Sequence, residues 1–365
     1  MKYVFVIHGL PIGGAEKFLI SLLHHFTEKR IDSYLILLSD DISLLHEVPD
    51  SVSVVKIKKS FKIDLSALFL LRRNLEFMQP DLIICINPYA FFIVKCATFF
   101  SHKYRICLSP HSTVPFNFKN KLQTYLYYSF FSSSDLIIFL CKTQKEYLVS
   151  KFPLRKSPSH IINNGIDLSY FQSNQDYNYL KKNDLDTSKI ILYVARLSPE
   201  KRHQDAIEVL KNLNIIHNDN IHLHIVGDGL SSYTMHIRKL VEDNNLSNFV
   251  HFMGSQRDVR PFYDSADLFL MTSSSETFSI AAIEAMSFGL PCVLTDVGGS
   301  SEIIMDDFNG YLCQPGNIID ITEKCSKALH KSWDKHKIIS NVNLKYSKKS
   351  MLDQYDVAFS SFINS

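Results

Sequence analysis

The sequence lacks a long apolar run, a closely spaced cysteine pair and any large excess of one charge. No stretch approaches the run of about eighteen or more apolar residues that a membrane-spanning helix needs. The seven cysteines are scattered and odd in number and form no CxxC pair, so we expect free thiols in a reducing compartment. The chain opens on a strand-like segment, Lys2–Ile7, that is too short and too soon followed by glycine to be a signal peptide. We therefore expect a cytoplasmic protein.

The small net charge of +2 conceals two halves of opposite sign. Residues 1–171 hold 20 lysines and arginines against 13 acidic residues, whereas the remainder holds 19 against 24. The length of 365 residues predicts two domains, each with its own core. Unless the asymmetry is chance, the basic half meets an anionic partner, for which phospholipid, a diphosphate-bearing acceptor and nucleic acid are the candidates.

Short apolar runs alternate with helical segments along both halves, a pattern typical of βαβ units and parallel sheets. In the first half we predict strands at 3–7, 34–38, 82–86, 105–108, 136–140 and 160–162, with helices at 67–77, 89–99 and 120–131. In the second half we predict strands at 190–195, 221–226, 250–253, 268–271 and 292–295. The polar residues 172–188 have the composition of a linker. We thus predict an α/β protein with a first domain at 1–171, a second at 172–345 and a helical tail at 346–365.

Two glutamates eight positions apart flank a helix start in the second half. Glu276 lies in the loop after the strand at 268–271, and Glu284 lies among apolar residues on the helix predicted at 278–288. A glutamate in apolar surroundings needs a partner, and the free N–H groups of a helix start attract anions. The pattern suggests a nucleotide-sugar site, with one carboxylate on sugar hydroxyls and the other on ribose hydroxyls. A surface glutamate and a helix glutamate paired with lysines is the alternative interpretation.

Two cations follow the strand at 190–195. Arg196 lies at its carboxyl end and Lys201 five residues later. They suit a diphosphate leaving group, because arginine binds phosphate through two parallel hydrogen bonds. An ordinary pair of solvated charges would explain them as well. Gly227 occupies a turn after the strand at 221–226, where we expect a nucleobase to lie nearby.

Glycines and a histidine follow strands of the first half. The spacing of Gly13 and Gly14 from Gly9 is not GxGxxG, which argues against a dinucleotide-binding loop. Glycine lets backbone N–H groups approach a phosphate, and a helix begins here. A plain tight turn in which Glu16 stabilises the helix start is the alternative. His111 follows the strand at 105–108 and is expected at the carboxyl edge of the sheet.

Taken in order, these motifs are similar to those of the retaining family-4 glycosyltransferases of GT-B fold. The resemblance rests on Gly13-Gly14-Ala15-Glu16, His111, Asn164-Gly165-Ile166-Asp167, Ala195-Arg196-Leu197 with Lys201, Gly227-Asp228-Gly229, the Glu276 and Glu284 pair followed by Gly289-Leu290-Pro291, and Asp296-Val297-Gly298-Gly299. It implies two Rossmann-like domains facing across a cleft, with a C-terminal helix that crosses back to the first domain. The chain departs from the family at Thr277, where glycine is common and where a positive φ would strain threonine.

The resemblance also implies roles for the residues of the second half. Arg196 and Lys201 would neutralise the departing diphosphate, assisted by the amides at Phe278, Ser279 and Ile280. Glu276 would hold the donor sugar and Glu284 the ribose.

In the first half, the resemblance implies that Gly13 and Gly14 close over the donor diphosphate, that Glu16 faces the acceptor and that His111 bonds a donor sugar hydroxyl. No metal or other cofactor is expected. The triplet at 184–186 resembles a DxD metal motif but follows no clear strand, and the histidines show no metal-ligand spacing. No nucleophile is obvious, which favours attack on the same face as the departing phosphate.

The acceptor suggested by the resemblance is a lipid-diphosphate-linked glycan of bacterial surface polysaccharide, such as O-antigen or capsule. Aromatic residues interleaved with Lys119 and Lys121 at 116–131, joined by Phe91, Phe92, Phe99, Phe100 and Lys95 at 90–103, suggest a peripheral face on the anionic inner leaflet, with an ordinary core helix as the alternative. We expect no nucleic-acid partner. A UDP-hexose or UDP-N-acetylhexosamine is the expected donor. The alternatives are a GDP-mannose-dependent mannosyltransferase, a soluble acceptor, a nucleotide-sugar epimerase on the same fold and an inactive tethering partner.

Overall fold

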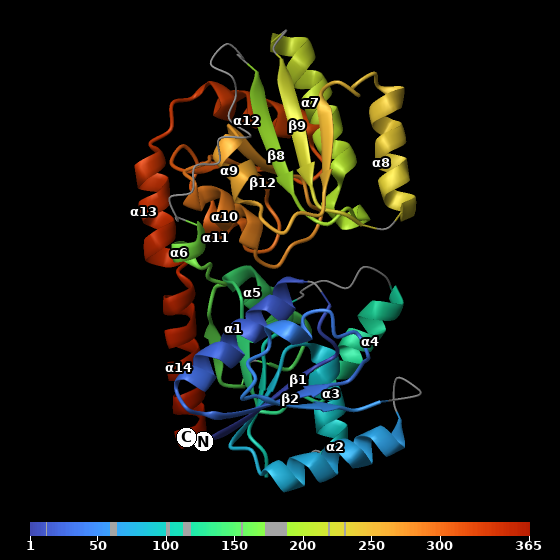
Figure 1. The fold of residues 1–365 in the computed structure, drawn as a ribbon, viewed down its shortest axis with the longest axis vertical. Coiled ribbons are helices and arrows are strands. Elements are labelled where there is room, and N and C mark those ends of the chain that lie inside the picture. Colours follow the sequence, from blue (N-terminus) through green and yellow to red (C-terminus); the bar gives the residue numbers. More distant parts are fainter. Residues whose placement is uncertain are drawn as a thin grey trace. The chain divides into compact units, whose positions relative to one another are not determined.

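The structure is a computed structural model. It describes residues 1–11, 13–58, 64–99, 103–111, 118–154, 156–171, 188–217, 220–229 and 231–365, and for residues 118–121 and 217 it describes the backbone alone. These residues form two compact units, one made of 1–164 with 351–365 and the other of 165–350. The expected divisions were 171/172 and 345/346. The triplet at 184–186 and nearly all of the predicted linker lie outside the described residues. Each unit is an open parallel sheet with helices against it (Figure 1), which confirms the predicted α/β class.

The sheet of the first unit has seven parallel strands in the order β3-β2-β1-β4-β5-β6-β7. Its order reverses between β1 and β4, since β1 pairs with β2 on one side and with β4 on the other. The inner strands β1, β4, β5 and β6 are almost wholly buried, as parallel strands covered on both faces must be, whereas the edge strands β3 and β7 are partly exposed. Their bounds are β1 (Lys2–Ile7), β2 (Asp32–Leu37), β3 (Ser53–Lys56), β4 (Leu82–Cys85), β5 (Ile106–Leu108), β6 (Leu136–Phe139) and β7 (Ser159–Ile161).

The helices of the first unit begin at recognisable caps. Asp64 accepts hydrogen bonds from the backbone N–H groups of Ser66 and Ala67 at the start of α2, and Asn87 accepts from Ala90 N at the start of α3. Each cap satisfies N–H groups that the first helical turn leaves unpaired. The helices are α1 (Gly14–Glu28), α2 (Leu65–Met78), α3 (Pro88–Ala97), α4 (Phe118–Ser129) and α5 (Lys142–Lys151), with a short 3₁₀ turn at Leu45–Glu47.

The C-terminal helix α14 (Lys348–Asn364) belongs to the first unit through its residues from Met351 onward. It runs beside α1, red against blue in Figure 1, and the rings of Phe26 and Phe359 stack with centroids 5.8 Å apart. Phe359 also meets Tyr3 of β1 edge to face at 5.9 Å. The tail therefore completes the apolar core on one face of the first sheet.

The second unit has six parallel strands in the order β10-β9-β8-β11-β12-β13. This order reverses between β8 and β11, so the chain winds outward from β8 to both edges. The strands are β8 (Lys189–Val194), β9 (Ile221–Val226), β10 (Val250–Gly254), β11 (Leu268–Met271), β12 (Cys292–Thr295) and β13 (Gly310–Cys313). The helices are α6 (Leu168–Phe171), α7 (His203–His217), α8 (Ser231–Asp243), α9 (Arg260–Ser265), α10 (Ile280–Ser287), α11 (Ser300–Ile303), α12 (Ile318–His330) and α13 (Lys335–Lys345), with a 3₁₀ turn at Pro199–Lys201.

The helix α3 corrects one prediction. Phe91, Phe92 and Lys95 were expected on a membrane face, but all three side chains are buried. The ammonium of Lys95 lies 2.8 Å from Oδ2 of Asp135, which is equally buried. Lys95 therefore forms an ion pair inside the unit and does not face a membrane. On α4, Leu122, Tyr125 and Leu126 are exposed, whereas Tyr128 is buried. The side chains of Lys119 and Lys121 lie outside the described residues.

All seven cysteines are free thiols, and six of them are buried. Burial raises the pKa of the Cys85, Cys107 and Cys325 thiols well above the usual value. Within the described part of the chain, no helix combines the length and apolar character required to cross a bilayer.

Candidate active site

The residues expected to bind the donor in the second unit all follow carboxyl ends of its parallel strands. Arg196 and Lys201 follow β8, Gly227 follows β9, and Glu276 follows β11. The order of the sheet reverses between β8 and β11, and in open parallel sheets ligands bind in the crevice outside such a reversal. Two loops that are distant in sequence therefore converge where a ligand is expected.

An ion pair joins these two loops. Lys201 Nζ contacts Glu276 Oε1, and both side chains are largely enclosed, at 19% and 15% exposure. Ser273 Oγ donates a further hydrogen bond of 3.3 Å to the same carboxylate oxygen. A cation and a carboxylate expected to bind different parts of one donor thus lie in direct contact.

Hydrogen bonds from two buried side chains hold the backbone of the loop after β8. The buried hydroxyl of Tyr193 donates to Lys201 O at 2.5 Å, and Thr272 Oγ1 donates to Arg202 O at 2.9 Å. Thr272 N donates in turn to the Tyr193 oxygen at 3.2 Å. Lys201 therefore projects from a rigid support, which is the requirement for a preorganised binding group.

Arg196 differs from Lys201 in its exposure. Its side chain is 72% exposed, and its guanidinium lies 3.6 Å from Glu200 Oε1. Because the guanidinium is solvated and the contact is long, this pair contributes little stability, and Arg196 can turn to an incoming phosphate at small cost. The structure brings Lys201 and Glu276 together and leaves Arg196 beside them on the same loop.

The loop after β12 packs against the loop that carries Glu276. Gly298 has a φ of +56°, and a Cβ there would lie 2.2 Å from the carbonyl oxygen of Glu276. Gly299 N donates to Thr277 O at 2.8 Å. Thr277 itself is not among the residues with a positive φ, so the strain considered for threonine at this position does not arise.

The helix α10 begins two residues later than predicted, at Ile280. Ser279 is its N-cap and accepts a hydrogen bond of 3.3 Å from Ala282 N. The side chain of Phe278 is buried and meets the ring of Tyr346 at 5.8 Å. The first turn of α10, with its free N–H groups, directly follows the Glu276 loop and can accept an anion.

Glu284 finds its partner in a residue that the sequence did not indicate. Tyr263, fully buried on α9, donates a hydrogen bond of 2.8 Å to Glu284 Oε2. Burial, together with the nearby Glu284 carboxylate, raises the pKa of the Tyr263 hydroxyl well above its usual range, so the phenol keeps its proton and donates. The half-buried carboxylate is thereby oriented.

Gly227 allows a close approach between two loops. Its φ is +137°, and a Cβ would lie 2.0 Å from the carbonyl oxygen of Ala195, the residue before Arg196. Any side chain at this position would displace the loop after β8.

The first unit holds the other predicted residues. Gly13 is the N-cap of α1 and Gly14 its first residue. Oε2 of Glu16 lies 2.4 Å from where a Cβ on Gly13 would stand, so Glu16 folds back over the helix start. That placement agrees with a role in stabilising the start of α1. That Glu16 faces the acceptor stays a prediction.

His111 lies at the carboxyl edge of the first sheet, as predicted. Its ring packs on Phe18 at 4.3 Å, and its Nε2 is enclosed without a hydrogen-bond partner among the described residues. Burial lowers the pKa of His111 to about 3, so the imidazole is neutral. A neutral ring with an unused nitrogen can bond a hydroxyl but is unsuited to carry a positive charge.

One group of potential metal ligands comes together among the described residues. It consists of His25, Asp353 and Asp356 in the first unit, where Lys29 already pairs with Asp356. None of the predicted site residues belongs to it. Catalysis without a metal stays a prediction.

The comparisons with known proteins agree with this geometry. A family model described as Glycosyltransferase Family 4 matches residues 12–170, and one described as Glycosyl transferases group 1 matches residues 177–345. Lipopolysaccharide 1,6-galactosyltransferase of Escherichia coli (strain K12) is 25% identical over 334 residues, which are 87% of this chain and 86% of that protein. N-acetyl-alpha-D-glucosaminyl L-malate synthase of Bacillus anthracis is 28% identical over 179 residues, 48% of this chain; the match spans only about half of the relative's length, 46%.

Among solved structures, Anabaena HepE in complex with UDP matches with a TM-score of 0.84 and 20% identity, over 99% of this chain and 100% of that one. At this identity the likeness shows a shared fold. The two matched regions together span nearly the whole sequence, and the chain belongs to the family-4 glycosyltransferases of GT-B fold, with two Rossmann-like domains.

Proposed function

We propose that this glycosyltransferase moves a hexose or N-acetylhexosamine from a UDP-sugar to a lipid-linked glycan of bacterial surface polysaccharide, with retention of configuration. The observation that carries the proposal is the contact between Lys201 and Glu276 at the reversal of the second sheet, directly before the start of α10. The UDP bound to HepE and the lipopolysaccharide substrate of the E. coli relative support the choice of donor and acceptor.

The donor spans the loops at the carboxyl ends of β8 and β11. Arg196 and Lys201 bind the diphosphate, together with the amides of the first turn of α10. Glu276, held by Lys201 and Ser273, accepts hydrogen bonds from sugar hydroxyls. Glu284, oriented by Tyr263, accepts from the ribose.

The transfer breaks the bond between the anomeric carbon and the diphosphate oxygen. The acceptor hydroxyl oxygen bonds to the anomeric carbon on the same face, and its proton passes to the departing phosphate oxygen. Lys201 and Arg196 stabilise the negative charge that grows on the diphosphate as the bond breaks, which is where fixed cations lower a barrier most. Lys201 is braced by Tyr193 and so needs little reorganisation during the step.

The enzyme works at the cytoplasmic face of the inner membrane, where its lipid-linked acceptor is held. The basic first half of the chain, with 20 cations against 13 acidic residues in 1–171, supports attraction to an anionic surface.

A transfer assay tests the proposal. The enzyme is incubated with UDP-glucose, UDP-galactose, UDP-N-acetylglucosamine or, for comparison, GDP-mannose, together with a polyprenyl-diphosphate-linked N-acetylhexosamine. The anomeric proton of the product is read by NMR. We expect an α-linked product from one of the α-configured UDP-sugars and a loss of rate by about a hundredfold or more in Lys201→Met. Lys211→Met is the matched control, because Lys211 forms a surface pair with Glu208 elsewhere in the second unit.

Three results would contradict the proposal. Isomerisation of the donor without acceptor would indicate an epimerase, and transfer only from GDP-mannose would indicate a mannosyltransferase. Normal transfer by Lys201→Met would show that Lys201 does not stabilise the departing diphosphate.

A further inference from the structure

The helix α2 exposes large apolar side chains on its outer side. Leu65, Phe69, Leu70 and Phe77 are 79%, 70%, 41% and 86% exposed. They lie on one half of the helix, opposite the core-facing positions Leu71, Leu75 and Met78. In Figure 1, α2 lies at the outer edge of the first unit, with no other element of that unit outside it. An apolar surface of this kind on a folded domain marks an interaction site.

Phe99 extends this surface beyond the end of α3. Its backbone is left-handed, with a φ of +49°, and its ring is 72% exposed. The guanidinium of Arg72 on α2 lies 4.7 Å from the centre of that ring, which places Phe99 beside α2. This left-handed turn ends α3 and leaves the ring of Phe99 exposed next to the outer side of α2.

The charge around this surface is strongly positive. From residue 56 to 105 the sequence has nine lysines and arginines against three acidic residues. Lys95 is buried against Asp135, Arg105 donates to Phe362 O, and Arg72 pairs with Glu76 on the same helix. Arg73 lies among the exposed apolar residues of α2, and Lys58 and Lys103 are exposed in the segments before and after it. Aromatic rings among cations fit the interface of an anionic bilayer, where rings enter the headgroup layer and cations meet lipid phosphates.

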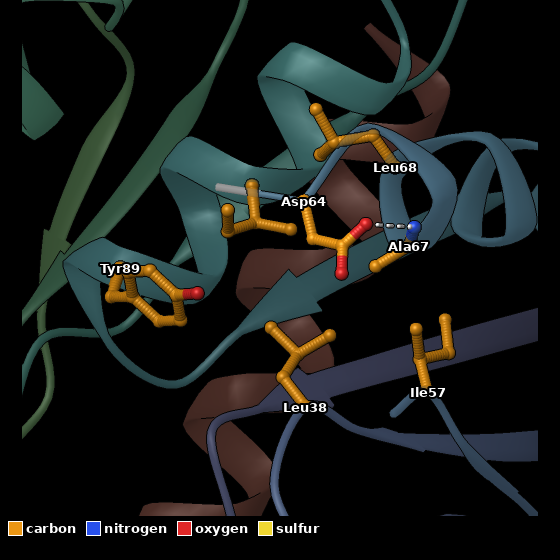
Figure 2. A pocket seen from close by; sticks show the side chains of 7 residues that line it. Leu38, Ile57, Asp64, Ala67, Leu68 and Tyr89 are labelled. Carbon is orange, nitrogen blue, oxygen red and sulfur yellow. Dashed lines mark hydrogen bonds between the residues drawn. The ribbon is translucent and has the colours of Figure 1, made fainter. Parts of the chain in front are cut away.

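A small apolar pocket lies on the inner side of the same helix. Figure 2 shows Leu38, Ile57, Leu68 and Tyr89 around it, with Asp64 bonded to Ala67 N at the start of α2. Because Leu38 and Ile57 directly follow β2 and β3, the pocket connects α2 with the carboxyl edge of the first sheet.

We propose that the outer face of α2, with Phe99, is the surface through which the protein binds an anionic lipid bilayer. The proposal rests on the proposed function in one respect, that the acceptor is held in such a bilayer. A second copy of the chain fits this surface poorly, because two such faces would bring the excess cations of both copies together. The rings insert between headgroups, and Arg72, Arg73 and the flanking lysines bind lipid phosphates.

Vesicle co-sedimentation of the full chain tests this surface. The wild type is mixed at low salt with vesicles of phosphatidylglycerol and phosphatidylcholine, and separately with phosphatidylcholine alone. We expect binding to the first only, and weakening in high salt. Phe69→Ser with Phe77→Ser should lower the partition coefficient by about tenfold or more, because two inserted rings are lost.

The control is Ile215→Ser with Leu344→Ser, which removes two side chains of similar exposure, 71% and 79%, from the second unit. It should bind vesicles like the wild type. Binding of UDP, measured by calorimetry on each preparation, should be equal in all three proteins. If the wild type does not bind UDP, the proposed function is overturned. The vesicle result would still test the lipid-binding surface independently.

Two outcomes would overturn the docking surface. One is equal vesicle binding by the α2 double variant and the wild type, or none by either. The other is a wild-type dimer, seen by sedimentation velocity, that becomes a monomer in the α2 double variant, since the face would then bind a second copy.

Discussion

Gly298→Ala should disrupt the donor site through a single added methyl group. A Cβ at Gly298 would lie 2.2 Å from Glu276 O and 2.8 Å from Thr277 O, so the Glu276 loop must move. Gly254 provides a matched control, because it also has a left-handed φ, +65°, but nothing lies within 4 Å of its would-be Cβ. Alanine in this conformation costs about 1–2 kcal/mol at either site. Overpacking at Gly298 adds about 1–3 kcal/mol.

The assay is urea unfolding of both variants, with UDP-sugar binding measured on the same proteins. We expect Gly254→Ala to lose about 1–2 kcal/mol of unfolding free energy and to bind donor normally. Gly298→Ala should lose about 2–5 kcal/mol and bind donor at least tenfold more weakly, because Glu276 and the start of α10 are displaced. Equal losses in the two variants, with unchanged donor affinity, would refute the reasoning about loop contact.

Three further predictions concern buried groups. Lys95→Met leaves the Asp135 carboxylate, 1% exposed, without its cation and should lower the free energy of unfolding by about 3–5 kcal/mol, measured in urea. The double variant with Asp135→Leu should recover much of this loss, and wild-type stability in Lys95→Met would contradict the prediction. Burial, followed by the Lys201 charge, lowers the pKa of His203 to about 4. Below pH 6.5 the unfolded chain therefore binds a proton that the folded chain does not bind. The free energy of unfolding should fall by about 1.4 kcal/mol for each pH unit between pH 6.5 and 4. His203→Gln should reduce this slope by one proton, and an unchanged slope would contradict the assignment. Tyr263→Phe removes the 2.8 Å bond to Glu284 and should weaken UDP binding several-fold, whereas unchanged binding would show that this bond does not orient the carboxylate.

The sequence predicted best the elements whose signal is local. The strands at 221–226, 268–271 and 292–295 have the predicted bounds. The last two are short apolar runs, and the first alternates apolar residues with His222 and His224. Strands β3 and β13 were not predicted. Residues Ser53–Lys56 are exposed or half-exposed and alternate weakly, and Gly310–Cys313 starts with a glycine, so neither has a strong strand signature.

The contacts that form the site could not be predicted from the sequence, because they join residues that are far apart in the chain. Glu284 was expected to need a partner, but Tyr263 lies 21 residues away on another helix. The cation at Lys201 and the carboxylate at Glu276 are 75 positions apart, and only the pairing of β8 with β11 brings their loops together.

The face of α3 was misassigned for a similar reason. Its aromatic residues and lysine resembled a membrane helix, yet Lys95 is neutralised by Asp135, 40 residues later in the chain. A helix that is apolar almost all round is a core helix, which its burial on nearly every side confirms.

The most direct test of the account is a thermal-shift panel of UDP-, GDP- and ADP-sugars against the wild type and Glu284→Ala. The account predicts that a UDP-sugar raises the unfolding temperature of the wild type, by a stabilisation of about 3 kcal/mol at a hundredfold excess over its dissociation constant. It also predicts that Glu284→Ala, folded but without the ribose contact, loses most of this shift. An equal shift in both proteins, or none with any nucleotide sugar, would contradict the claim that the second unit holds the donor through this residue.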